Sequence, residues 1–297
     1  MSGSYIGDTS IEDAMVTGTL SSYTNSRITT IGEGAFAYAK KLKSISCPNA
    51  TTIGSSAFVN CGSLTTISFP LVTTIYEYAF YYCSKLSTAS FPKVKEIKNG
   101  AGTLQGAFKD CTSLTTANFP LATSIPASTF YGCRDLITVS FPLATTIGDE
   151  AFDRCQELTT LNIPNATTIG SSAFFNCRSL TTINFPLVTT IGNEVFRNCF
   201  SLVTVSFPAA TTIGNNAFYF CYNLKSLYLM GSSVCQLLHS GAFYSTPIGG
   251  YSASAGTYGS IYVPSSLVAS YQAATNWAYF SSRIVAYDSG NSGGAGD

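Results

Sequence analysis

A block of about 22 residues recurs nine times along the 297-residue chain, and it limits the possible folds more than any other feature. Cysteines at positions 61, 83, 111, 133, 155, 177, 199 and 221 are spaced 22 residues apart, except for one interval of 28. The block reads T-T-I-G-x-x-A-F-x-x-C-x-x-L-T-T-I-x-F-P-x-A/V. Its nine copies open at Thr29, Thr51, Thr73, Lys95, Thr123, Thr145, Thr167, Thr189 and Thr211. A fixed period in the twenties predicts a solenoid, because one such unit cannot bury its apolar side without stacked neighbours.

The apolar slots within one block predict a coil that is mostly β. The end of Leu180–Phe185 alternates with the period of a strand, and the β-branched Thr189–Ile191 predicts a second short strand. Ala173–Cys177 has the spacing of one helical turn, and Pro186 ends the first strand because it has no amide to donate. We therefore expect an α/β but mostly β repeat solenoid with a parallel sheet, nine repeats and terminal caps.

The places where the sequence departs from the repeated block give the expected domain boundaries. We assign 1–28 to an N-terminal cap, 29–232 to the solenoid with an insertion at 98–105, 233–288 to a degenerate repeat with a C-terminal cap, and 289–297 to a flexible tail.

The C-terminal cap is expected to contain a strand and then a helix. The helix should follow Pro264, with Ser265 or Ser266 as its N-cap. Trp277 is the single tryptophan, and it should pack this cap against the last coils.

The stretch LTTINFPLVTTIGNEVFRNC (Leu180–Cys199) and its sibling copies resemble the leucine-rich repeats of the BspA-like group of bacterial surface proteins. The resemblance covers roughly Ile28–Leu229, and Ile261–Tyr287 resembles the closing segment found after such arrays. It implies a curved leucine-rich-repeat solenoid used for adhesion or recognition, without catalytic activity.

The repeated cysteine is predicted to be structural. Zinc sites need closely spaced cysteine pairs or histidine partners, but the chain has no C-x-x-C and its single histidine is His239. A nucleophile would need a base beside each copy, and equivalent slots point in parallel, which is poor geometry for disulfides. Ala39 fills the same slot in the first repeat, so we expect a small buried apolar residue there, and no metal, cofactor or catalytic cysteine.

An enzyme of the glycosidase type would need two carboxylates near each other. Asp149 with Glu150 or Asp153 is the pair that the sequence offers, and we expect all three on an exposed corner of the coil. The sequence therefore predicts no enzyme and no catalytic residue.

The isoleucine–glycine corner of each repeat, as at Gly170, suggests a left-handed turn. In the fifth repeat Pro126 occupies that slot. Because proline fixes φ near −65°, a left-handed turn is not possible in this repeat.

Two surfaces are candidate binding sites. The outward positions of the strand, such as Thr182 and Asn184, tile a sheet with hydroxyls and amides that could bind sugars or a protein edge. A solvated face without a ligand and an ice-binding face are the alternatives, since threonine is also an ordinary exposed strand residue.

The second surface consists of slots beside A-F and C, which vary between repeats and should face outward. Aromatic residues there favour recognition. Tyr219, Phe220 and Tyr222 should instead pack beneath the C-terminal cap. The candidate binding residues are Tyr76, Tyr78, Tyr81, Tyr82, Tyr131, Phe175, Arg178 and Phe200, together with Thr182 and Asn184.

The net charge and the hydropathy of the chain limit the kinds of binding partner that we expect. Fifteen Lys and Arg balance fifteen Asp and Glu, which argues against nucleic acid and anionic membranes. There is neither an apolar run of membrane-spanning length nor a signal peptide at the start of the chain. We still favour an extracellular, cell-surface or virion location, because of the resemblance.

The predicted function is a non-enzymatic binding or adhesion module for a host protein or glycan. The alternative is a structural or receptor-binding component of a bacteriophage tail, or an intracellular scaffold.

Overall fold

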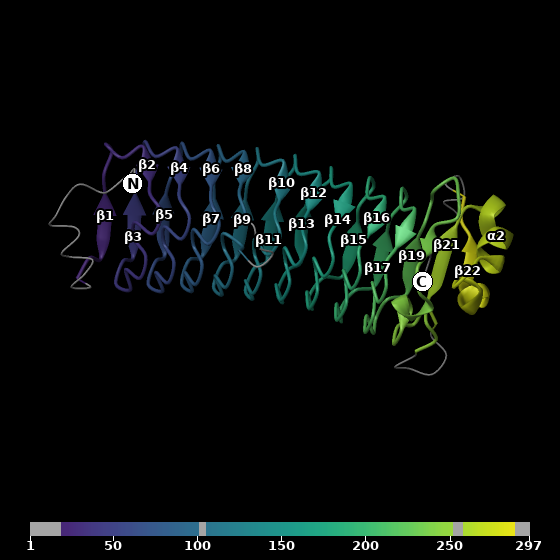
Figure 1. Cartoon of the computed structure of the whole chain (residues 1–297). Helices are drawn as coiled ribbons and strands as arrows, with labels where there is room; N and C mark the ends of the chain where they lie inside the picture. Colours follow the sequence, from purple (N-terminus) through teal and green to yellow (C-terminus); the bar gives the residue numbers. More distant parts are fainter. Residues whose placement is uncertain (1–18, 101–104, 252–257, 289–297) are drawn as a thin grey trace.

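The computed structural model describes residues 19–100, 105–251 and 258–288, which form one elongated stack of coils (Figure 1). The predicted mostly-β solenoid with parallel strands is confirmed, and each coil contributes one strand to each of two rows. The first row, here called the polar sheet, contains β1 Ser22–Thr24, β3 Ser44–Ser46, β5 Thr66–Ser68, β7 Thr88–Ser90, β9 Thr116–Asn118, β11 Thr138–Ser140, β13 Thr160–Asn162, β15 Thr182–Asn184, β17 Thr204–Ser206, β19 Ser226–Tyr228, β21 Ser260–Val263 and β22 Ile284–Ala286.

The second row consists of two-residue strands whose second residue is buried in the core; it is isoleucine in all of them except β20, which has Leu237. It is interrupted between β8 and β10, where the insertion lies. Its strands are β2 Thr30–Ile31, β4 Thr52–Ile53, β6 Thr74–Ile75, β8 Glu96–Ile97, β10 Ser124–Ile125, β12 Thr146–Ile147, β14 Thr168–Ile169, β16 Thr190–Ile191, β18 Thr212–Ile213 and β20 Gln236–Leu237.

The stack is longer than the nine repeats expected from the sequence. Within the described residues the polar sheet has twelve strands, because β1 extends it before the first repeat and β21 and β22 extend it after the ninth. Residues 1–18 of the proposed N-terminal cap, 101–104 of the insertion and the proposed tail 289–297 lie outside the described residues. The two ends of the array continue its backbone pairing, which satisfies strand edges that would otherwise be open.

Stacked phenylalanines fill the centre of the coil. The phenylalanine of each A-F pair lies on its copy in the next coil, as for Phe80 and Phe108, with ring centroids 5.0 Å apart and planes 7° apart. A second row from the strand, with Phe119 and Phe141 at 4.8 Å, packs beside it. Such rings bury 150–250 Å² each, so these two rows provide much of the hydrophobic stabilisation.

The segment after the second strand does not form the helical turn expected from Ala-Phe-x-x-Cys. In residues 54–61 the amides alternate: Val59 donates to the Ser56 carbonyl within the coil (3.1 Å), while Phe58 donates to the Ala79 carbonyl of the next coil (2.7 Å). Ser56 has a positive φ of 55°. Successive turns thus place alanine, phenylalanine and cysteine inward with helix-like spacing and also pair the backbone between coils, which a helix could not do.

All ten cysteines are buried free thiols, which confirms the structural interpretation. The thiols also have a role that was not predicted, because each one in the array hydrogen-bonds to the coil before it. The Sγ of Cys177 donates to the Phe152 carbonyl at 3.2 Å, and that of Cys199 donates to the Phe174 carbonyl at 3.2 Å. Burial raises the pKa of these thiols well above the usual range, which makes them unreactive.

The left-handed turn suggested for the glycine corner is wrong. Gly170, Gly192 and Gly214 do not have positive φ. A Cβ on Gly214 would lie 2.6 Å from the Gly192 carbonyl carbon of the coil below, so close approach of the coils explains these glycines. The left-handed positions come later in each repeat and are mostly filled by residues other than glycine.

The C-terminal cap contains η1 Ser240–Phe243, η2 Ser265–Leu267, α2 Val268–Ala273 and η3 Ala278–Arg283. Trp277 packs the cap onto the array as predicted: it is fully buried, and its indole N–H donates to the Cys235 carbonyl at 2.6 Å. The predicted serine N-cap is wrong, because neither η2 nor α2 has a side-chain cap. The Ser265 amide donates instead to the Asp288 carboxylate (3.0 Å).

Candidate binding surfaces

The residue that follows each A-F pair lies in one row along the edge of the solenoid, from the third to the ninth repeat. Within this row, which we call the aromatic row, aromatic and charged side chains alternate. The stacking of coils sets these side chains side by side, because each occupies the same place in its repeat. In order along the stack they are Tyr81, Lys109, Tyr131, Asp153, Phe175, Arg197 and Tyr219.

Cations of the row lie between aromatic rings. The Lys109 ammonium is 5.9 Å from the Tyr81 ring centroid and 4.6 Å from that of Tyr131. The Arg197 guanidinium lies in the same way between Phe175 (5.6 Å) and Tyr219 (5.0 Å). Each such contact contributes about 0.5–1 kcal/mol at an exposed site, so the row is ordered before any ligand arrives.

Asp153 interrupts this pattern, because an anion lies where the two other charged slots hold cations. The sequence placed Asp153 on an exposed corner, but the residue is only 7% exposed. Its Oδ1 atom has no hydrogen-bond partner. This burial raises the pKa of Asp153 to about 7, although nearby Arg154 and a hydrogen bond from Asn176 lower it.

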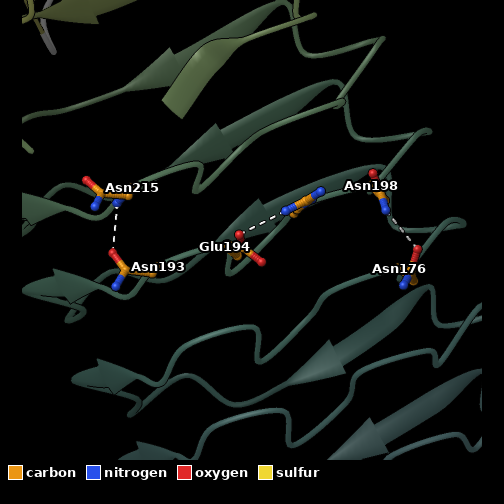
Figure 2. Close-up of polar contacts among 6 residues, drawn as sticks. Asn176, Asn193, Glu194, Asn198 and Asn215 are labelled. Atoms are coloured by element: carbon orange, nitrogen blue, oxygen red, sulfur yellow. Dashed lines mark hydrogen bonds and ion pairs between the residues drawn. The ribbon is translucent and has the colours of Figure 1, made fainter. Parts of the chain in front are cut away.

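Asparagine side chains join neighbouring coils beside the row. Figure 2 shows the Asn198 amide donating to the Asn176 side-chain oxygen (3.1 Å) and the Asn215 backbone amide donating to the Asn193 side chain (2.9 Å). Glu194 forms an ion pair of 2.9 Å with Arg197 of the row. These contacts fix the spacing of side chains along the edge, so the ring and cation positions are set by the scaffold.

The third-repeat tyrosines form a cluster at one end of the row. Tyr78 and Tyr82 lie against Tyr81, with ring centroids 5.2 Å and 4.3 Å away, and Tyr82 is 44% exposed. Tyr76 lies apart from these rings and receives the Lys98 ammonium 5.2 Å from its centroid.

At the other end, the aromatic surface widens over the last coils. Arg178 lies 5.4 Å from the Phe200 ring, which stacks on Tyr222 (5.4 Å). Tyr219 stacks on Tyr244, which is 57% exposed, at 4.9 Å. The expected packing of Tyr219 under the C-terminal cap is therefore only partial: the degenerate repeat touches one side of the ring, and this surface stays half-exposed.

Along this edge the backbone adopts a conformation that is energetically unfavourable for several of its residues. The residue after each row position has a positive φ, and asparagine, aspartate or glycine fills it in several repeats. Tyr82, Arg154 and Phe220 adopt φ of 57°, 62° and 62° there. A left-handed conformation costs a bulky residue about 1–2 kcal/mol. Strain of this kind collects at functional sites.

The other candidates, Thr182 and Asn184, lie in β15 of the polar sheet and not in the aromatic row. Both are exposed, and they line a cleft of about 460 Å³ together with Thr160 and Asn162 of β13. Apart from Tyr76, the predicted residues thus fall into two surfaces: the aromatic row with its flanking rings, and one opening in the polar sheet.

Sequence reasoning did not select Lys109, Asp153 and Arg197 as candidate binding residues. Comparing one slot across all repeats, instead of searching for aromatic residues alone, would have found them. Asp153 was considered as a carboxylate of a catalytic pair, but burial in an aromatic row was not anticipated, because the slot was assumed to face water.

Two kinds of feature are absent from the part of the chain that the structure describes. No group of three or more His, Cys, Asp and Glu is placed to hold a metal ion there. No described helix has the length and hydropathy needed to cross a bilayer.

A family model for the BspA type leucine rich repeat region matches this chain with six copies, over residues 16–137, 103–225 and 145–255. A comparison with curated proteins finds no match. Among solved structures, a leucine rich cell surface protein from Faecalibacterium prausnitzii A2-165 is 22% identical, with 83% of this chain and 82% of that chain covered and a TM-score of 0.50. This similarity supports the fold alone.

Two further solved structures are similar at lower TM-scores. A leucine-rich repeat protein from Bacteroides ovatus ATCC 8483 is 22% identical, with 74% of this chain and 84% of that chain covered and a TM-score of 0.44. The pneumococcal vaccine antigen PcpA is 15% identical, with 90% and 77% covered and a TM-score of 0.46.

Proposed function

Because the chain belongs to the BspA-type leucine-rich repeat family, we propose that it is a non-enzymatic binding module that recognises a protein ligand through the aromatic row. The alternation of rings and cations along this row is the observation that carries the proposal. Tyrosine and arginine are enriched among residues that contribute most to protein–protein binding. Adhesion at a cell surface is the setting in which we place this activity.

The geometry favours a protein over a free glycan for this row. The rings and cations of the row extend over seven repeats, which matches the extended footprint of a protein interface better than one sugar subsite. The rings are already held by cation–π contacts and interlocking coils, so little entropy is lost when a partner orders them.

The test uses a panel of immobilised extracellular-matrix and cell-surface proteins, together with a glycan array. We expect the chain to bind at least one protein, and the double variant Phe175→Ser/Arg197→Ser to bind it at least tenfold more weakly. A variant of the polar sheet, Thr204→Ser, is the matched control and should bind as the parent does. The proposal fails if no protein on the panel binds, or if the double variant binds as tightly as the parent.

A further inference from the structure

We propose that the cleft between β13 and β15 binds an extended, uncharged peptide segment, which adds to the polar sheet as an inserted strand. This site lies outside the aromatic row and does not depend on the function proposed above. The argument rests on the backbone pairing, the width of the opening and the residues that line it.

The polar sheet lacks backbone pairing between β5 and β7 and again between β13 and β15. The cleft lies at the second of these breaks, and the strand pairs on either side of it keep their ladders. The Thr159 amide donates to the Ile137 carbonyl (3.1 Å), and the Val203 amide donates to that of Thr181 (2.8 Å). Among the described residues, no corresponding bond joins Thr181 to the Thr159 carbonyl. Both strands therefore present edge groups to the same opening, and such groups are a template for another strand.

The missing bonds extend along the strand to its proline end. The Phe141 amide donates to the Asn162 carbonyl at 2.9 Å, and the Phe185 amide donates to that of Ser206 at 3.1 Å. In the described residues the amide of Ile163 makes no such bond to Asn184. An inserted backbone would find donors and acceptors on both sides, as in known cases of strand addition to a sheet.

The opening is wider than the spacing of paired strands. Most Cα–Cα distances between β13 and β15 exceed 8 Å, while paired strands lie about 4.8 Å apart and an inserted strand needs about twice that. The opening is local, because β14 and β16 behind it remain paired in register. Insertion therefore requires a further separation of β13 and β15, while the second row behind them stays paired.

The residues that line the cleft indicate which kind of peptide segment would bind there. Thr160, Asn162, Thr182 and Asn184 are exposed at the rim, and none of the lining residues is charged. The inward Leu161 of β13 is only partly buried. The preferred ligand is thus an uncharged segment with one aliphatic residue between two small polar ones, since its central side chain would cover Leu161.

A sugar fits these features less well. The single aromatic lining residue, Phe185, is 3% exposed and offers no ring face for stacking. The unused groups at the opening are backbone amides and carbonyls in the spacing of a strand, which a peptide backbone matches and a pyranose does not.

The test uses a fluorescein-labelled synthetic peptide that carries residues 202–207 of the chain, LVTVSF, between two lysines. The sequence has the required pattern and already forms a strand in this protein. A second peptide has the same side chains but alternate N-methylated amides, which cannot donate. We measure anisotropy with the whole protein and follow hydrogen exchange at Ile163 and Thr181. We expect saturable binding, slower exchange at both amides, and at least tenfold weaker binding of the methylated peptide.

Closing the cleft gives an independent check. Thr160→Cys/Thr182→Cys, once bridged by a methylene bis-methanethiosulfonate reagent, carries a covalent link across the opening, because this short linker tolerates parallel side chains that are poorly placed for a direct disulfide. The crosslinked protein should lose peptide binding and regain it on reduction. The control Thr116→Cys/Thr138→Cys bridges β9 and β11, which are already paired, and should bind in both redox states.

Several outcomes would overturn the inference: equal binding of the methylated peptide, unchanged binding by the crosslinked protein, or no protection of the two amides at millimolar peptide. Protection of the amides by neutral oligosaccharides but not by the peptide would assign the cleft to a glycan instead. The Phe175→Ser/Arg197→Ser variant should bind the peptide normally, so failure here is distinguishable from failure of the function proposed for the aromatic row.

Discussion

Replacing Asp153 with asparagine should stabilise the protein, and the gain should depend on pH. The carboxyl is 7% exposed and its pKa is about 7, raised first by loss of solvation on burial. The asparagine side chain would keep nearly the same shape and one acceptor for the Asn176 amide, while removing the charge. The substitution therefore isolates the cost of ionising this side chain inside the aromatic row.

The magnitude follows from the difference between the folded and unfolded pKa. The folded value of about 7 is some three units above the ordinary 3.8, and one unit corresponds to about 1.4 kcal/mol. Between pH 4 and 7 the folded state holds the proton more tightly than the unfolded state does. The free energy of unfolding of the parent protein therefore falls as pH rises through this window, by about 4 kcal/mol at most.

Urea unfolding followed by far-UV circular dichroism, at pH 4, 5, 6, 7 and 8, measures this effect. The Asp153→Asn variant should be more stable than the parent at pH 8, and the difference should shrink toward zero at pH 4. Asp149→Asn in the same coil is the control, because Asp149 is exposed. A gain of equal size at all pH values would refute the reasoning, as would a parent whose stability rises between pH 4 and 7.

Three further predictions follow from local contacts. Ellman's reagent at pH 8 should label none of the ten buried thiols in the native protein and all ten in guanidinium; rapid labelling of the native protein would contradict their burial. Trp277→Phe should lower the free energy of unfolding by about 1–3 kcal/mol, since it leaves the buried Cys235 carbonyl without its 2.6 Å partner, and an unchanged denaturation midpoint would contradict this. Tyr38→Asn should raise the free energy of unfolding by about 1 kcal/mol, because Tyr38 is 62% exposed with a φ of 62° and asparagine tolerates that conformation better; a loss in thermal stability would show that the tyrosine ring contributes more than its strain costs.

The fold was predictable because it depends on slots that all repeats share. The period, the strand at Thr182–Asn184 and the inward phenylalanines follow from apolar spacing alone. The segment Ala173–Cys177 was expected to be a helical turn, but it forms alternating turns. The two conformations cannot be distinguished by apolar spacing, because both place the same side chains inward. Only the pairing of amides with the next coil distinguishes the two, and a single repeat read alone does not contain that information.

The candidate sites were predictable only in part, for a different physical reason. Aromatic residues such as Tyr81 and Phe175 were recognised by type, but their order along one edge depends on how coils stack. The opening beside Thr182 could not be predicted, because its neighbouring strands have nearly the same sequence as those that remain paired.

The sixth repeat concentrates the departures from the array. It has Ile163 where six other repeats have phenylalanine, and Asp153 where its neighbours have an aromatic ring. The structure departs in the same coil: β13 is unpaired to β15, as β5 is to β7 elsewhere in the stack, and the carboxyl of Asp153 is buried with one unpaired oxygen. In a solenoid each repeat is stabilised mainly by its two neighbours, so one coil can carry these costs without unfolding the rest. Ile163 lies beside the opening in the polar sheet, and Asp153 lies in the aromatic row. Residues that lower stability are expected at positions that bind a ligand, so this pattern fits a role of the sixth repeat in binding.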